Sequence, residues 1–183
     1  AASDVYKRQG TKSTPSLNFN DESTIVKAAE FIKKKNKQIS ILFDATGVLH
    51  YENFMPEKTF KNINFKFMEK NFLINAIGPA LLIKHFAPLL DNQKKSVFAT
   101  LSAKVGSIND NNYGGWYSYR ASKAALNQLI KTISIEMKIK NKQAIFIALH
   151  PGTVNSNLSK PFQKNNLKIQ EASESAQNLI KII

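Results

Sequence analysis

Three short apolar runs, each closed by turn-forming residues, constrain the fold of this chain most strongly. They read QISILFDA (38–45), KKSVFATLS (94–102) and QAIFIALHP (143–151). Each is rich in β-branched or aromatic residues, and none shows the apolar/polar alternation of a strand with one solvated face. Strands that are buried on both faces are typical of parallel sheets. The runs therefore predict three parallel strands in one sheet.

Helical patterns separate the predicted strands. The stretch 21–37 begins with acidic and hydroxyl residues, which suit a helix N-terminus, and ends in lysines, which suit a C-terminus. Further helical patterns cover 60–90, 115–140 and 171–183. Helices and strands thus alternate along the whole chain. This order predicts an α/β fold with a doubly wound parallel sheet.

Composition limits the domain organisation and the chemistry. A chain of 183 residues with 43% hydrophobic content can form one domain with a sizeable core. We expect residues 1–16, which show no periodicity and no apolar signal-peptide core, to be an unstructured or non-native leader, followed by a single domain over 17–183. The absence of cysteine excludes disulfides and thiolate metal sites, and a reducing, cytoplasmic setting fits best.

The net charge of +13 raises the question of a nucleic-acid partner. The cationic residues are almost all lysines dispersed in short runs, and no aromatic residues alternate with them. This favours a solvated lysine-rich surface over a nucleic-acid site. The most apolar stretch, FLINAIGPALLIKHFAPLL (72–90), contains two prolines, a lysine and a histidine, and therefore predicts a buried helix and no membrane partner.

Candidate chemistry lies at the carboxyl ends of the predicted strands. Ligands of doubly wound sheets bind there, and Gly47, Gly106 and Gly152 each follow a strand. Nearby, the helical segment YSYRASKAALNQL (117–129) places Tyr119 and Lys123 one turn apart on one helix face. In a lysine-rich chain with five tyrosines, one such spacing is expected by chance. The pair alone therefore leaves chemistry and coincidence open.

Five motifs occur in a fixed order at these strand ends: FDATGVLH, INAIGPALL, LSAKVGSI, YSYRASKAALN and LHPGTVNS. Together they resemble the short-chain dehydrogenase/reductase family, and most closely its C-factor-like branch, from about residue 17 to the end. The resemblance implies a Rossmann-like fold and an oxidoreductase that transfers a hydride between NAD or NADP, with NADP favoured, and a small-molecule carbonyl or hydroxyl substrate. It also implies a homo-oligomer. A cell–cell signalling or interaction protein on the same scaffold is the alternative.

The resemblance assigns catalytic roles to four residues. Tyr119 would exchange a proton with the substrate oxygen, and Lys123 would favour its phenolate, because a free phenol has a pKa of about 10. Asn75 would support a proton relay, with a purely structural hydrogen-bonding role as the alternative. Ser102 would polarise the substrate oxygen, with Ser107 as second choice. Aligning the family's Ser-Ser-x-x-Gly pattern on its glycine places Ala103 at the serine position, so a bulge is needed to bring Ser102 there.

The resemblance also assigns the cofactor contacts, to Asn18, Ala45, Gly47, Tyr119, Lys123, Pro151, Gly152 and Val154. At 44–47 the sequence reads DATG where the family has Asn-Asn-Ala-Gly, so backbone contacts are carried over but no asparagine role is given to Asp44. Trp116 and Tyr117 are expected either to line the substrate pocket or to be core aromatics. The three histidines are expected to be packing or surface residues, and no metal site is expected.

One family feature is missing. A dinucleotide fold holds the pyrophosphate with a glycine-rich turn between a strand and a helix. The only glycine before Gly47 is Gly10, and no strand pattern precedes it. By comparison with the family, the first β-α-β-α portion and the last strand are absent. We therefore expect a sheet that is truncated at both ends, exposes an apolar edge and face, and binds the cofactor weakly.

Overall fold

The elements occur in the predicted order. The structure is a computed structural model and describes residues 12–35, 38–163 and 168–183. The helices are α1 (Glu22–Lys33), α2 (Phe65–Phe72), α3 (Gly78–Phe86), α4 (Tyr117–Lys140) and α5 (Ala172–Ile180). The strands are β1 (Ile41–Asp44), β2 (Ser96–Leu101), β3 (Ala144–Leu149), β4 (Thr153–Val154) and β5 (Ile169–Gln170). Most of the predicted leader, residues 1–11, lies outside the described part of the chain.

The main sheet is parallel, as predicted, with the strand order β1-β2-β3. Phe43 is in register with Ala99 of β2, and Phe98 of β2 is in register with Phe146 of β3. All three strands therefore point their carboxyl ends toward the same edge. The two-residue strands β4 and β5 form a separate parallel pair that the sequence analysis did not predict, because two residues carry no periodicity.

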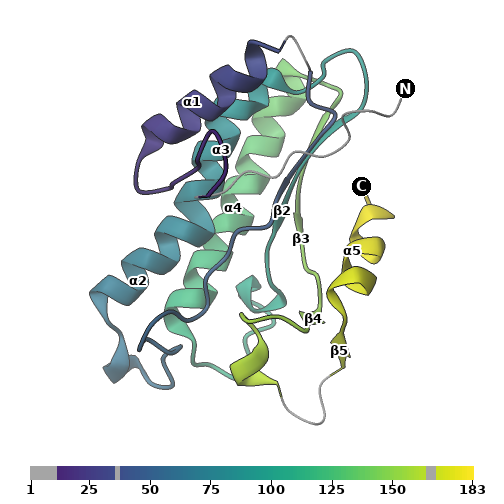
Figure 1. Cartoon of the computed structure of the whole chain (residues 1–183). Coiled ribbons are helices and arrows are strands. Elements are labelled where there is room, and N and C mark those ends of the chain that lie inside the picture. The colour runs from purple at the N-terminus through teal and green to yellow at the C-terminus, as the bar shows by residue number, and fades with distance from the viewer. Residues whose placement is uncertain (1–11, 36–37, 164–167) are drawn as a thin grey trace.

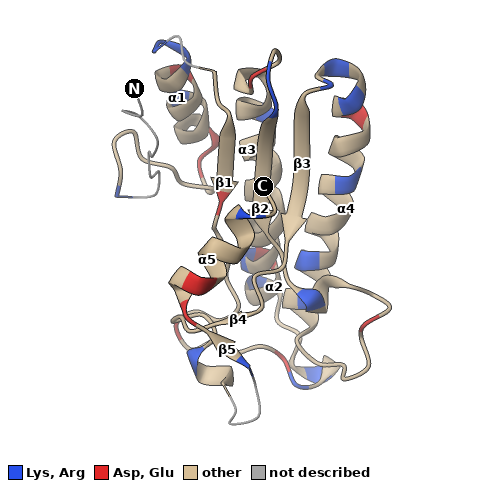
Figure 2. Cartoon of the chain, turned by 90° about the vertical axis from the view of Figure 1, so that its right-hand side faces the viewer, with Lys and Arg blue, Asp and Glu red and all other residues tan. Residues whose placement is uncertain are grey.

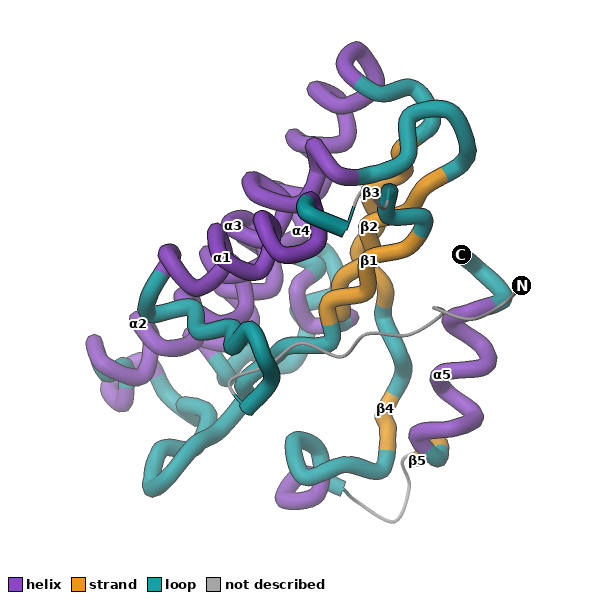
Figure 3. Tube along the Cα trace, turned by 45° about the horizontal axis from the view of Figure 1, so that its top comes forward, coloured by secondary structure: helices purple, strands orange, loops and turns teal. Residues whose placement is uncertain are grey.

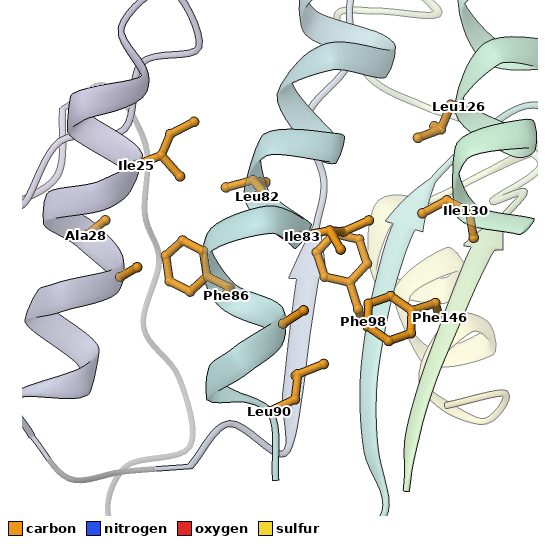
Figure 4. Close-up of a cluster of buried hydrophobic side chains, with 12 residues drawn as sticks. Ile25, Ala28, Leu82, Ile83, Phe86, Leu90, Phe98, Leu126, Ile130 and Phe146 are labelled. Atoms are coloured by element: carbon orange, nitrogen blue, oxygen red, sulfur yellow. The ribbon is translucent and has the colours of Figure 1, made fainter. Parts of the chain in front are cut away.

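Helices α1 to α4 cover one face of the main sheet, and α5 lies on the other side (Figures 1 and 3). The larger core lies between the sheet and the helices α1 to α4. Its buried side chains include Ile25, Phe86, Phe98, Leu126 and Phe146 (Figure 4). The Phe98 and Phe146 rings stack with their centroids 5.8 Å apart. We call this side of the sheet the helix face.

The opposite side, which we call the α5 face, is less completely covered. Its core joins Val97, Ala99 and Leu149 of the sheet to Leu179 of α5. Other apolar residues of this face stay exposed: Ile41 at 58%, Phe43 at 40% and Ile145 at 41%. The expectation of strands buried on both faces therefore holds for β2 only, and the expected exposed apolar face is present.

The apolar run 72–90 lies in a helical stretch that extends from Phe65 to Leu89. This stretch is long and apolar enough to cross a membrane by length and composition alone, a test that core helices also pass. Its residues Phe67, Leu82, Ile83 and Phe86 are buried within the protein, with at most 6% of each exposed. The stretch serves here as a packing element of the helix face.

The lysines are spread over the surface, including the C-terminal end of α1 and the outer side of α4 (Figure 2). Some form exposed ion pairs, such as Lys84 with Glu22 and Lys140 with Glu136. Exposed pairs of this kind contribute little to stability. The charge distribution matches the solvated surface that the sequence indicates.

Candidate active site at the carboxyl ends of the strands

The end of β1 carries a buried carboxylate. Asp44 is 3% exposed, and its two oxygens accept hydrogen bonds from the Thr46 backbone N–H (2.9 Å), the Thr46 hydroxyl (2.7 Å) and the Thr100 hydroxyl (2.7 Å). Three donors offset much of the cost of burying this charge. The substitution of aspartate for the family's asparagine is therefore matched by two threonines that donate to it.

The loop after Asp44 brings the candidate residues together. Ala45 and Gly47 are exposed, so their backbone groups are open to a ligand. A Cβ atom at Gly47 would lie 3.7 Å from Asn75 Oδ1 and 3.8 Å from Lys123 Nζ. Three residues that are far apart in the sequence thus meet at the carboxyl end of β1.

Asn75 lies in a single turn of π-helix, Leu73–Ile77, between α2 and α3. It is fully buried. Its Nδ2 donates to the Val48 carbonyl oxygen (2.8 Å) and to Ser122 Oγ (3.0 Å), and its Oδ1 accepts from the Val48 N–H (2.9 Å). The side chain therefore ties the loop after β1 to α4. Interruptions of this kind are frequent at functional sites, which agrees with the assignment of Asn75 to the site.

Tyr119 and Lys123 lie in the first two turns of α4 and are 7% and 3% exposed. The ammonium nitrogen is 6.0 Å from the centroid of the tyrosine ring. Burial raises the pKa of Tyr119 to about 12. In this structure the hydroxyl is therefore a proton donor, and the phenolate that the sequence analysis expects Lys123 to favour is disfavoured by burial.

The ammonium group of Lys123 is directed to the end of β2. Its Nζ donates to the Leu101 carbonyl oxygen at 2.7 Å. Burial lowers the pKa of Lys123 to about 8, and the negative charge of Asp44 opposes this shift. Lys123 thus retains a charge near neutral pH in an almost fully buried position.

The serine candidates differ from the expectation. Ser102 is buried, and its hydroxyl donates to Asn127 Oδ1 at 2.7 Å. Asn127 is eight residues beyond Tyr119 on α4, or roughly 12 Å along the helix axis. Ser107 is exposed, and its Oγ accepts a long bond from the Asp110 N–H (3.4 Å). The expected bulge that would turn Ser102 toward Tyr119 is not found, because its backbone N–H continues the pairing to Leu149 at 2.7 Å.

Gly106 explains why the segment after β2 lies so close to α4. A Cβ atom there would come within 2.9 Å of the backbone carbon and the Cβ of Lys123. A side chain at this position would force the two segments apart. The glycine of LSAKVGSI therefore has a packing role beside Lys123.

Aromatic rings gather at the start of α4. The Trp116 ring contacts the Tyr119 ring edge-on, with centroids 6.2 Å apart, and also contacts Phe162, at 5.0 Å. Trp116 is only partly buried, so part of its ring stays open to solvent beside Tyr119. The sequence analysis missed Phe162, since nothing in its neighbourhood signals a site.

The predicted nicotinamide segment follows β3. Gly152 has φ +75°, a left-handed conformation that favours glycine, and a Cβ atom there would also displace the end of the Gln170 side chain, 2.4 Å away. The Pro151 carbonyl oxygen accepts a bond from the Ser175 hydroxyl of α5 (3.0 Å), and Val154 belongs to β4. This segment is therefore fixed between β3 and α5.

Asn18 makes only local hydrogen bonds among the described residues. Its Oδ1 accepts from the Asn20 backbone and side chain, both at 3.0 Å, and its backbone N–H donates to Thr24 Oγ1 (2.9 Å). It shapes the turn that leads into α1. The cofactor contact assigned to Asn18 stays a prediction.

The histidines behave as packing and surface residues. His50 contacts the Phe162 ring edge-on, His85 pairs with Glu22, and the backbone N–H of Lys104 donates to His150 Nδ1 (3.3 Å). Within the described segments, no group of three or more His, Asp or Glu side chains is placed to hold a metal ion.

Comparison with known proteins shows the family to which the chain belongs. The family model for short chain dehydrogenases matches residues 4–167. The chain belongs to the short chain dehydrogenase family. The carbonyl reductase from chicken fatty liver, in an NADPH-bound crystal structure, superposes with a TM-score of 0.78 at 26% identity, over 91% of this chain and 64% of that protein. The carbonyl reductase Sniffer of Drosophila melanogaster, at 20% identity and a TM-score of 0.77 over 91% of this chain and 67% of that protein, shares the fold.

Curated relatives support the family membership as well. A 1-hydroxy-2-glutathionyl-2-methyl-3-butene dehydrogenase of Rhodococcus sp. (strain AD45) is 27% identical over 169 residues, which are 92% of this chain and 70% of that protein. The C-signal protein of Myxococcus xanthus is 31% identical over 100 residues, 55% of this chain and 59% of that protein. The chain thus spans between three fifths and seven tenths of the length of these two relatives.

The described residues fit one end of a nicotinamide dinucleotide. The groups that the resemblance assigns to the nicotinamide end include the backbone of 45–47, which is exposed, the Lys123 ammonium and Gly152, which has φ +75°. The described residues offer no comparable contacts to the pyrophosphate end of the cofactor. Residues 12–46 contain no glycine, so no glycine-rich phosphate turn precedes or follows α1 in this range. The candidate cofactor contacts among the described residues are therefore restricted to the nicotinamide end.

Proposed function

We propose that this chain carries the proton-transfer part of an NAD(P)-dependent oxidoreductase that acts on small-molecule carbonyl or alcohol substrates. The observation that carries the proposal is the convergence of Tyr119, Lys123 and Asn75 beside the exposed loop after β1. Two of these are ionisable groups that are at least 93% buried, and buried ionisable groups at the ligand-binding edge of a sheet are candidates for a functional site. Family membership supplies the class of reaction.

A bound nicotinamide supplies or accepts the hydride in this class of reaction. The residues of this chain transfer the proton and stabilise the charges that result. In the reductive direction the Tyr119 hydroxyl, which like any phenol is protonated at neutral pH, donates its proton to the substrate oxygen as negative charge develops there. The Lys123 ammonium stabilises the phenolate that remains. Asn75 holds the loop after β1 and the second turn of α4 in place.

Replacement of Tyr119 by phenylalanine tests the proposal. The change removes one oxygen and keeps the ring that contacts Trp116, so cofactor binding and fold should persist. We expect turnover of the complete protein with NADPH or NADH and a set of aldehydes and ketones to fall by about 10²-fold to 10⁴-fold. Turnover at the parental rate in Y119F would contradict the assignment.

Cofactor binding by the 183-residue chain is a separate test. We propose weak binding, because the residues described up to Gly47 include no glycine-rich phosphate turn. Titration with NADPH and with NADH, followed by nicotinamide fluorescence, should show little binding at micromolar concentrations. Micromolar affinity would show that contacts to the nicotinamide end of the cofactor are sufficient for binding. The same titration compares the affinities for NADPH and NADH and so tests the preference for NADP over NAD.

A signalling or interaction role is the second candidate, favoured by the likeness to the C-signal protein of Myxococcus xanthus. The buried Tyr119 and Lys123 pair has no use in a pure scaffold, so we rank the enzyme first. A signalling activity that survives in Y119F would show that the second role is independent of the chemistry.

Three further parts of the proposal rest on the sequence analysis. We propose a single partial domain over 17–183, a cytoplasmic setting, which agrees with the absence of cysteine, and a homo-oligomer for the complete protein. Light scattering of the purified protein tests the oligomeric state. The proposed roles of Asn18, Pro151 and Val154 in cofactor binding are tested by the NADPH titration of alanine or glycine variants.

A further inference from the structure

One buried carboxylate has no role in the proposed proton transfer. Glu57 is 3% exposed and lies in the loop between β1 and α2. Within the described ranges, no lysine, arginine or histidine forms an ion pair with it. A buried charge is costly unless other groups compensate it, so the partners of Glu57 indicate its purpose.

All partners of Glu57 lie at the beginning of α4. Its carboxylate oxygens accept the Ser118 backbone N–H at 3.3 and 3.2 Å, and the Ser118 hydroxyl also donates to the carboxylate. Its backbone carbonyl oxygen accepts the Trp116 N–H at 2.6 Å. The helix has no side-chain cap of its own at Trp116, so a residue 61 positions away in the sequence from Ser118 supplies the cap. Negative charge at a helix N-terminus is also favourable for the helix dipole.

The backbone at this helix start is strained. Trp116 has φ +54° and follows Gly114 and Gly115, which have φ +63° and +66°. A bulky residue in the left-handed region is a genuine outlier, and such strain persists only where surrounding contacts impose it. Here those contacts are the bond from Trp116 to Glu57 and the bond from Arg120 Nε to the Gly115 carbonyl oxygen (3.0 Å).

The strained backbone conformation at Trp116 sets the direction of its indole ring. Trp116 lies between Tyr119 and Phe162 and contacts both rings edge-on. Ser118 lies two residues after Trp116 and directly precedes Tyr119. Its backbone N–H donates to the Glu57 carboxylate. Glu57 therefore holds the aromatic wall through its backbone carbonyl oxygen and the turn of helix that carries the proton donor through its carboxylate.

We propose that Glu57 is a positioning residue that holds Trp116 in its left-handed conformation and so builds an aromatic wall for the substrate beside Tyr119. The role of the wall as a substrate contact rests on the proposed function. The contacts of Glu57 with Trp116 and Ser118, which we call the clamp, do not depend on the proposed function. A wall of this kind selects substrates with a flat apolar or aromatic body, since edge-on and stacked ring contacts favour them.

The only tryptophan of the chain, Trp116, gives a direct readout of the clamp. Glu57→Gln keeps the shape of the side chain and removes its charge. Glu69→Gln makes the same change at an exposed helical glutamate and is the matched control. E57Q weakens the cap on Ser118 and so loosens the loop whose backbone carbonyl oxygen holds Trp116. In the 183-residue chain we expect E57Q to shift the tryptophan emission to the red and to raise the acrylamide quenching constant about twofold, as Trp116 leaves the strained state. E69Q should match the parent in both measurements.

A second variant covers the case in which E57Q does not fold. Ser118→Ala removes the hydroxyl donor and leaves the backbone N–H, so it should change the emission in the same direction by a smaller amount. A parental emission maximum and quenching constant in a folded E57Q protein, or in a folded S118A protein if E57Q does not fold, would overturn the clamp.

The substrate preference is measured on the complete protein. We expect E57Q to lower kcat/KM for acetophenone about fivefold relative to its effect on butanal, mainly through KM. An equal effect on both substrates would overturn the wall as a specificity element. If the parent turns over neither compound, the proposed function fails, and the fluorescence result still decides whether Glu57 holds Trp116.

Discussion

The two faces of the sheet are built differently. On the helix face, three helices bury a continuous core, and Phe98 is fully buried against Phe146. On the α5 face, a single short helix covers the centre of the sheet and leaves Ile41 58% exposed and Ile145 41% exposed. The candidate catalytic residues come from the helix-face layer, from α4 and from the π-turn before α3. These candidate catalytic residues thus lie where packing fixes side chains, and among the described residues the α5 face contributes only the bond from Ser175 to the candidate cofactor segment at Pro151.

The largest expected difference is in stability. Phe98→Ala removes a fully buried ring from the helix face and should lower the free energy of unfolding by about 4 kcal/mol. Phe43→Ala makes the same change on the α5 face, where the ring is 40% exposed, and should cost about 1 kcal/mol or less. Urea denaturation of both variants measures the two values. Equal costs would break the comparison between the faces.

A pH-dependent effect of intermediate size is expected at Lys123. Because burial lowers its pKa from 10.5 to about 8, the folded state binds the lysine proton less tightly than the unfolded state. The stability of the parent should therefore fall, relative to Lys123→Met, as the pH falls from 10.5 to 8, by about 3 kcal/mol in total. Below pH 8 the difference should be constant.

Denaturation of parent and K123M at a series of pH values checks this expectation. The raised pKa of Tyr119 acts in the opposite direction above pH 10, where stability is lost as the pH rises, so the two proteins are compared between pH 8 and pH 10. Lys131→Met, at an exposed position of the same helix, is the control and should show no such dependence. A flat difference for K123M would mean that Lys123 is not buried in the helix face.

The smallest effect is expected at Ser102. Its side chain lies on the helix face and donates to Asn127, so Ser102→Ala should cost about 1 kcal/mol of stability. Turnover of the complete protein should change by no more than about threefold, because the hydroxyl lies about two helical turns from Tyr119. A loss of turnover of about 10²-fold or more would restore the catalytic role that the sequence pattern suggests. Ser107→Ala, at an exposed position, is the comparison variant.

Local sequence patterns determined much of this protein. Apolar runs of strand length and helical periodicity located β1 to β3 and all of the long helices, because those signals depend on neighbours within a few residues. The order of five motifs at the strand ends identified the family and brought Tyr119, Lys123 and Asn75 into consideration. The missing phosphate turn and the exposed apolar face could also be anticipated from the sequence, since both follow from elements that are absent from it.

Only the tertiary structure decided the features that depend on contacts between distant segments. The direction of the Ser102 hydroxyl depends on whether β2 continues to pair with β3, and the raised pKa of Tyr119 depends on how α4 is covered. The role of Glu57 depends on a loop that meets the start of α4 from 61 residues away. No periodicity marks a buried glutamate in a loop or a tryptophan at positive φ. Long-range packing fixed these features, and with them the details of the site.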